Sequence, residues 1–187
     1  ATAPVPAQID LHSYASVAAV LEEAFAKFRD RPAFHSFGKE LSYGQIDELS
    51  RQFAGYLTGV LKLGKGDRIA IMMPNVLQYP IALFGALRAG LVVVNTNPMY
   101  TARELKHQLE DAGAKAIVVL DNFAATLQQV VAETEVEHIV TTGIGRDIVL
   151  GGAGADTINT FASRGANGVA GTAVQDGNNI VFGDYGF

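Results

Sequence analysis

Two long segments in the first part of the chain place apolar residues at helical spacing. After Ser16, whose hydroxyl can cap a helix, apolar residues recur every three or four positions until Arg31, which precedes a proline. The residues from Ser42 to Gln45 then have the S-x-x-Q form of a capping box. The apolar face that follows predicts a second, longer helix that Gly64 closes.

Short apolar runs predict β-strands between and after these helices. Residues 33–37 and 40–43 flank Gly38-Lys39, which predicts a hairpin with a two-residue turn. Further along, strands and helices alternate. The predicted strands are residues 68–73, 91–94, 116–120 and 138–141, and the predicted helices are residues 78–89, 102–113 (capping box Thr101–Glu104) and 123–135 (capped by Asn122). This alternation is typical of an α/β fold with a layered parallel sheet.

The composition changes near residue 141. Residues 142–187 hold 11 of the 20 glycines, four Asp and two Arg, but no Lys, Glu, Pro or His. Residues 1–141 hold all six prolines and all four histidines. We therefore predict two domains of different character, residues 1–141 and residues 142–187.

Composition and charge exclude several classes of protein. The net charge is −5 and no basic block is present, which argues against a nucleic-acid partner. The absence of cysteine excludes disulfides, Cys-ligated zinc and a thiol nucleophile. No apolar run reaches the roughly 18 residues of a membrane span, and the first ten residues show no secretory signal. The four histidines, His12, His35, His107 and His138, lack the spacing of a metal site.

Several motifs in the first domain resemble one family. The segment 65–75 reads KGDRIAIMMPN, residues 78–90 read QYPIALFGALRAG, and residues 95–109 read NTNPMYTARELKHQL. Together these segments are similar to bacterial long-chain fatty-acid–CoA ligases of the adenylate-forming superfamily, over residues ~9–141. The resemblance implies an α/β N-terminal subdomain of an enzyme that joins a fatty acid to coenzyme A through an acyl-adenylate, with ATP and magnesium.

The same resemblance implies that this chain lacks the chemistry of the complete enzymes. The family's Ser/Thr/Gly-rich phosphate loop, its magnesium-site glutamate, its ribose-binding aspartate and its catalytic lysine have no counterpart in this sequence. Adenylyl transfer depends on positioning and on stabilising developing charge, which such groups supply. We therefore assign no catalytic or cofactor-binding residue and expect the chain alone to be inactive.

The second domain carries two consecutive nonapeptides. Residues 142–150 and 151–159 both fit the pattern G-G-x-G-x-D-x-U-x, with Thr142 in place of one glycine. The pattern resembles the calcium-binding RTX repeat, which winds into a parallel β-roll. Calcium prefers hard anionic oxygens, and glycines permit the tight turns of the roll. The candidate calcium ligands are Asp147 and Asp156, together with the backbone of Gly143, Gly145, Gly152 and Gly154.

The two resemblances point to different compartments and leave alternatives open. Ligases of this family work in the cytoplasm, where a fatty acid is the substrate and peripheral membrane contact accompanies some members; RTX repeats fold outside the cell. Such a combination indicates a gene fusion, a frameshifted or misassembled reading frame, a fragment or a chimera. Two alternatives to the ligase hypothesis remain open. The chain could be a calcium-binding secreted or surface module, or a non-catalytic module that binds a partner or forms a homodimer.

Overall fold

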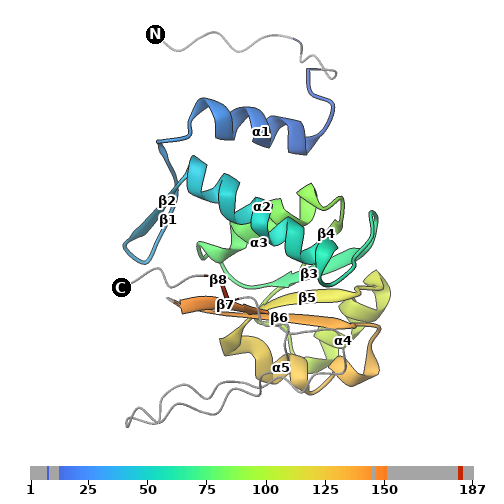
Figure 1. Ribbon diagram of the computed structural model, residues 1–187. Coiled ribbons are helices and arrows are strands. Elements are labelled where there is room, and N and C mark those ends of the chain that lie inside the picture. Colours follow the sequence, from blue (N-terminus) through green and yellow to red (C-terminus); the bar gives the residue numbers. More distant parts are fainter. Residues whose placement is uncertain (1–7, 9–12, 145, 151–180, 183–187) are drawn as a thin grey trace.

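The computed structural model describes residues 8, 13–144, 146–150 and 181–182, and of residues 146–150 and 181–182 the backbone alone. Its secondary structure begins with a helix, a hairpin and a second helix, and continues as alternating strands and helices (Figure 1). The elements are α1 (Val17–Lys27), β1 (Pro32–Ser36), β2 (Lys39–Ser42), α2 (Tyr43–Gly59), β3 (Arg68–Met72), α3 (Gln78–Arg88), β4 (Val92–Asn95), α4 (Ala102–Ala112), β5 (Ala116–Leu120), η1 (Asp121–Phe123), α5 (Ala124–Gln128), η2 (Val131–Glu133), β6 (His138–Gly143), β7 (Arg146–Leu150) and β8 (Val181–Phe182).

The main sheet has the strand order β4-β3-β5-β6-β7-β8. The strands from β4 to β6 are parallel to one another, and β7 and β8 are added antiparallel to the β6 side. All five residues of β5 are buried, as expected for a central parallel strand that is covered on both faces. The α/β fold class predicted from the sequence is confirmed.

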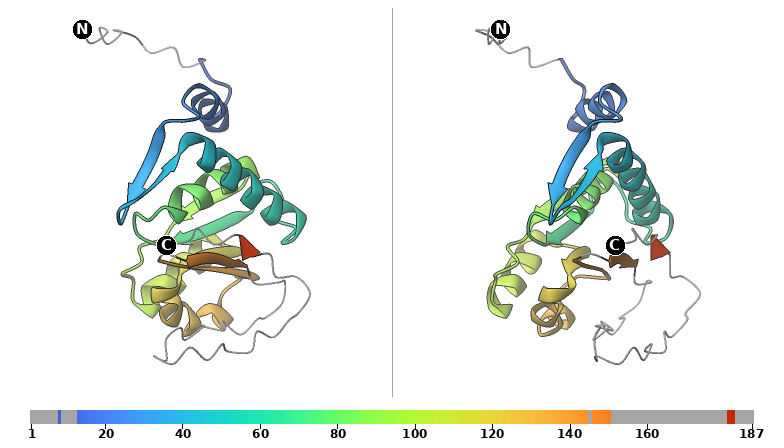
Figure 2. Two further views of the ribbon diagram at one scale, coloured as in Figure 1. Left: turned by 60° about the vertical axis from the view of Figure 1, so that its left-hand side comes forward. Right: turned by 90° about the vertical axis from the view of Figure 1, so that its left-hand side faces the viewer.

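Helices cover both faces of this sheet. Helices α2 and α3 pack over one face, and α4 and α5 lie on the other (Figures 1 and 2). The β5 side chains divide between the two faces by strand alternation. Ala116, Val118 and Leu120 pack with the α2 and α3 residues, whereas Ile117 and Val119 pack with Leu105 and Leu109 of α4 and Leu127 of α5. The sheet therefore has two apolar cores, one on each face.

Local signals account for most helix boundaries. The side chain of Ser16 caps α1, and both predicted capping boxes are present, at Ser42 with Gln45 and at Thr101 with Glu104. Gly113 ends α4 in the left-handed conformation, with φ of 58°. These helix ends were predictable because each depends on residues within one turn.

Several predicted boundaries are wrong: helix α1, for example, ends at Lys27 and not at Arg31. The hairpin turn consists of Phe37 and Gly38, both with positive φ, and Lys39 belongs to β2. Helix α2 ends at Gly59 instead of near Gly64, because the chain turns at Lys62, whose φ is 57°, and Leu63 donates a hydrogen bond back to the Leu57 carbonyl.

The predicted continuous helix over residues 123–135 is also wrong. The structure has a short 3-10 turn, a five-residue helix and a second 3-10 turn in its place, and Asn122 lies inside the first turn. No side-chain cap begins α5, and β-branched residues follow at Val130 and Val131. Both features disfavour a long helix.

The end of the first predicted domain lies within a strand. Strand β6 continues past residue 141 to Gly143 and pairs with β7. The structure therefore describes a sheet that extends beyond the change in composition, and the division into residues 1–141 and 142–187 stays a prediction.

The crossing of α2 and α3 requires a glycine. A Cβ atom on Gly85 would lie 2.7 Å from Cδ1 of Phe53 and 3.0 Å from the carbonyl oxygen of Ser50, both on α2. Phe53 is 1 % exposed and Ser50 is fully buried, so neither has space to retreat. The two helices can approach this closely only because position 85 has no side chain.

We expect Gly85→Ala to lower the free energy of unfolding by about 1–3 kcal/mol, because the new methyl group overpacks a filled contact. Gly55→Ala, on the exposed face of α2 with nothing within 4 Å of the added Cβ, is the matched control. It should be neutral or stabilise by about 0.5–1 kcal/mol. Urea unfolding of both variants measures the difference; equal stabilities would contradict the close contact.

Candidate functional site

The carboxyl edge of the parallel strands is the candidate site. The chain leaves β3 toward β4 on one side and leaves β5 toward β6 on the other, so the connections diverge between β3 and β5. In open α/β sheets, ligands bind outside the strand ends at such a switch point. The loops after β3, β4, β5 and β6 all lie at this edge because the strands are parallel.

Polar side chains connect the loops at this edge. Gln78, the first residue of α3, donates a hydrogen bond from Nε2 to the Gly143 carbonyl at the end of β6, over 2.8 Å. The hydroxyl of Tyr79 donates to Oδ1 of Asn95 at the end of β4, also over 2.8 Å. The start of α3 therefore holds the ends of strands on both sides of the switch point.

This edge also has one buried hydroxyl without a hydrogen-bond partner in the described chain, and several exposed apolar side chains. The hydroxyl of Thr142 is buried and has no hydrogen-bond partner among the described residues. Large apolar side chains stand exposed around the same edge: Phe37 is 76 % exposed, Met99 77 % and Ile144 51 %. Phe37 lies near this edge, because the hydroxyl of its neighbour Ser36 donates a hydrogen bond to the Asn75 carbonyl in the loop after β3. The edge thus combines polar groups at the strand ends with an apolar rim.

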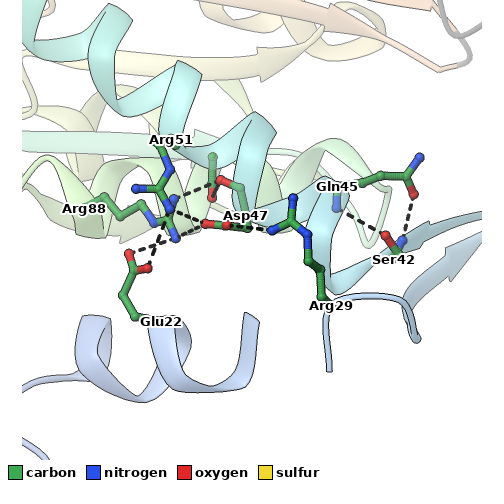
Figure 3. Close-up of polar contacts among 8 residues, drawn as sticks. Glu22, Arg29, Ser42, Gln45, Asp47, Arg51 and Arg88 are labelled. Carbon is green, nitrogen blue, oxygen red and sulfur yellow. Dashed lines mark hydrogen bonds and ion pairs between the residues drawn. The ribbon is translucent and has the colours of Figure 1, made fainter. Parts of the chain in front are cut away.

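A buried ion cluster holds the other end of α3. Nη2 of Arg88 lies 2.6 Å from Oδ1 of Asp47 on α2, and Nη1 donates to the Asp47 carbonyl over 2.9 Å (Figure 3). Oδ1 of Asp47 also lies 2.8 Å from Nη2 of Arg51. The Arg88 and Asp47 side chains are 8 % and 15 % exposed, so water screens this pair weakly.

The pKa of Asp47 reflects its surroundings. Burial raises this pKa, but hydrogen bonds from Arg88 and Arg51, together with their positive charges, lower it by more. The pKa of the folded carboxyl therefore lies below its ordinary value. Asp47 consequently stabilises the fold at neutral pH, and this contribution is lost as the pH falls through the carboxyl range.

The cluster was only partly predictable from the sequence. Asp47 and Arg51 are four positions apart on one helix, which is a recognisable ion-pair spacing. Arg88 lies 41 positions from Asp47, and only the packing of α3 on α2 brings it there. No local pattern signals such a pair.

The predicted calcium ligands fall at the limit of the described chain. Gly143 ends β6, and Asp147 is the second residue of β7. Asp156, Gly145, Gly152 and Gly154 lie outside the described residues. Among the residues that the structure describes, no three His, Cys, Asp or Glu side chains are grouped to hold a metal ion.

The histidines that the structure describes are dispersed. His35 lies exposed on β1, His107 exposed on α4, and His138 buried at the start of β6. In the part of the chain that is described, no helix has the length and apolar character to cross a bilayer.

Comparisons with known proteins agree with this fold. A family model described as "AMP-binding enzyme" matches residues 21–161. The chain belongs to the AMP-binding enzyme family. The match covers the sheet from β3 to β7 and the helices on both its faces.

The curated relatives are named long-chain-fatty-acid–CoA ligases. The protein from Yersinia pestis is 54 % identical over 143 residues, which is 76 % of this chain and 25 % of that protein. The protein from Bacillus subtilis is 36 % identical over 125 residues, covering 67 % of this chain and 22 % of that protein. The chain therefore spans about a quarter of the length of the curated relatives it matches, and the resemblance noted in the sequence is confirmed at the level of this N-terminal region.

Solved structures share the architecture. A long-chain-fatty-acid-CoA ligase from Archaeoglobus fulgidus is 26 % identical with a TM-score of 0.62, over 67 % of this chain and 27 % of that one. A benzoate CoA ligase from Burkholderia xenovorans matches with a TM-score of 0.63 and 24 % identity, over 67 % of this chain and 25 % of that one. The second likeness concerns the fold alone.

We expect Asp47→Asn to lower the free energy of unfolding at neutral pH by about 2–4 kcal/mol, because the nearly buried Arg88 would lose its closest carboxylate and keep only the half-exposed Glu22 as a counter-ion. The variant should also lose part of the decline in stability that the parent shows as the pH falls below about 5. Unfolding curves between neutral and acidic pH measure both effects.

Asp30→Asn is the matched control, since Asp30 is exposed and makes no ion pair with the residues that the structure describes. It should leave the stability within about 0.5 kcal/mol of the parent. A loss as large as that of Asp47→Asn would show that the effect is one of net charge and not of the cluster.

Proposed function

We propose that this chain supplies the N-terminal part of a long-chain fatty-acid–CoA ligase. The observation that carries the proposal is the 54 % identity to the Yersinia pestis ligase, which extends over the strands and loops that form the carboxyl edge. In the longer protein, ATP would activate a fatty acid as an acyl-adenylate, and coenzyme A would then take up the acyl group. The carboxyl edge would line part of that reaction's site.

The described residues have a supporting role in this proposal. Gln78 fixes the end of β6 relative to α3, and Tyr79 fixes the end of β4. Both contacts order the loops beside the reacting groups, and preorganised geometry is what adenylyl transfer requires of a protein. No group of acidic side chains fit for magnesium occurs among the described residues, so we assign no magnesium-dependent step to them.

We expect the purified chain to show no acyl-adenylate formation from ATP and a long-chain fatty acid. By contrast, a Yersinia pestis ligase whose aligned segment is replaced by residues 21–143 of this chain should keep activity within about tenfold of its parent, because most packing contacts are preserved. Pyrophosphate release and acyl-CoA formation measure the two reactions.

Gln78→Ala in the replaced segment serves as the site-specific comparison. It removes the bond to the Gly143 carbonyl and should lower kcat/KM while the melting temperature stays close to that of the unchanged hybrid. A folded but inactive hybrid would contradict the proposal, as would turnover by the isolated 187-residue chain.

For residues 142–187 we propose calcium binding by the RTX-like repeats, in accord with the two in-phase nonapeptides. Homodimer formation, peripheral membrane contact and an extracellular site for this segment stay predictions.

Titration of the chain with calcium, followed by calorimetry, tests the repeat proposal. We expect saturable heat that is lost in Asp147→Asn and Asp156→Asn, because the amide supplies less charge to the ion. Asp30→Asn is the control for net charge and should bind as the parent does. The absence of any response at about millimolar calcium, the weak end of protein sites, would contradict this proposal and leave the ligase proposal untouched.

A further inference from the structure

Helix α1 contacts the rest of the fold from Leu21 onward, where Leu21 packs against the core and Phe25 is buried. Phe25 is its single buried residue, and its ring meets those of Phe84 and Tyr43 edge-on at 5.9 Å and 6.5 Å. Toward the start of the helix, Val17 is 64 % exposed and Val20 40 % exposed. Figure 1 shows α1 as a separate outer layer above α2. Its apolar contact is therefore small for a helix of 11 residues.

The ion cluster reaches α1 through one carboxylate. Oε1 of Glu22 lies 2.9 Å from Nη2 of Arg88, and Oε2 lies 3.8 Å from Nη2 of Arg51 (Figure 3). The guanidinium carbon of Arg88 also lies 5.1 Å from the centre of the Phe25 ring. Arg88 thus makes both a charge contact and a cation–π contact with α1.

The cluster has two parts with different exposure. The inner pair, Asp47 with Arg88, joins α2 to α3 and is nearly excluded from water. The outer contact is made by Glu22, whose side chain is 50 % exposed. Salt screens exposed charges far more than buried ones. Added salt therefore weakens the attachment of α1 before it weakens the attachment of α2 to α3.

We propose that α1 is a releasable helix whose docking is controlled by charge. Glu22 holds α1 in place through its contacts with Arg51 and Arg88, and the Asp47–Arg88 pair keeps Arg88 in position. In the docked state Glu22 neutralises part of the guanidinium cluster of Arg51 and Arg88. In the released state α1 moves away as a unit, and the aromatic surface of Tyr43 and Phe84 becomes accessible. Ionic strength shifts the balance toward release, while the sheet and its two cores stay folded.

The hinge for this movement lies directly after the helix. The Arg29 carbonyl accepts a hydrogen bond from the Gly44 amide over 2.8 Å, and the Arg31 carbonyl accepts one from the Tyr43 amide over 3.0 Å. A Cβ on Gly44 would lie 2.9 Å from Cγ of Arg29, so this crossing is tight. The backbone from Arg29 onward is consequently anchored to α2, and release is confined to the residues before it.

Hydrogen exchange of the full chain, resolved by mass spectrometry, tests the proposal at about 0.01 M and about 1 M salt, where charges are screened over ~30 Å and ~3 Å. In the parent, peptides from α1 should exchange roughly three- to tenfold faster at high salt, while peptides from β3 and β5 stay unchanged. Glu22→Gln should show the faster exchange already at low salt and little further response, because the contact that salt screens is gone.

Glu23→Gln is the matched control. It makes the same change one position along the same helix, at an exposed side chain that forms no ion pair with any described residue. It should keep the low-salt protection of the parent and its salt response. Equal effects of the two variants would overturn the proposal, and so would acceleration of β3 and β5 together with α1, since that would indicate global unfolding.

Discussion

The packing of α2 across α3 is the contact on which the remaining architecture depends. Gly85 lets the two helices approach, and the Asp47–Arg88 pair fixes their rotation about that point. Because α3 begins at the carboxyl edge and ends at the ion cluster, one rigid helix connects the candidate site to the attachment of α1. The same pair of helices covers one face of β3 and β5. A change in the distance between the helices would therefore disturb both the core and the candidate site.

The sequence predicts this fold well where the signal is local. Strand β5 has the predicted bounds, since a buried run between a helix-ending glycine and a polar turn has few other interpretations. The prediction of one helix over residues 123–135 was wrong: its apolar spacing resembles that of a helix, but no side chain caps α5 and the β-branched Val130 and Val131 follow shortly after it. The turn at Phe37 was missed for a similar reason, because an aromatic residue with positive φ is uncommon.

The candidate site was less predictable than the fold. Family resemblance located the region, but the bonds from Gln78 and Tyr79 join residues 65 and 16 positions away, through a topology that no short pattern encodes. The ion cluster shows the same limit, since its buried member Arg88 comes from a different helix. Local capping and periodicity position the elements, whereas the contacts that organise the edge arise only when those elements meet.

The strand order has a consequence for how the chain reaches its native state. In the main sheet, β4, β3 and β5 pair only with strands separated from them by at least one helix, and β5 pairs with β3 on the side opposite to β4. To pair residues that are distant in sequence, the chain must first close a long loop. The entropy lost on closure precedes any stabilisation by the new contacts. The β1–β2 and β6–β7 hairpins can form from neighbouring residues. We therefore expect formation of the sheet to depend on helix docking, with the packing of α3 on α2 as one determinant of its rate.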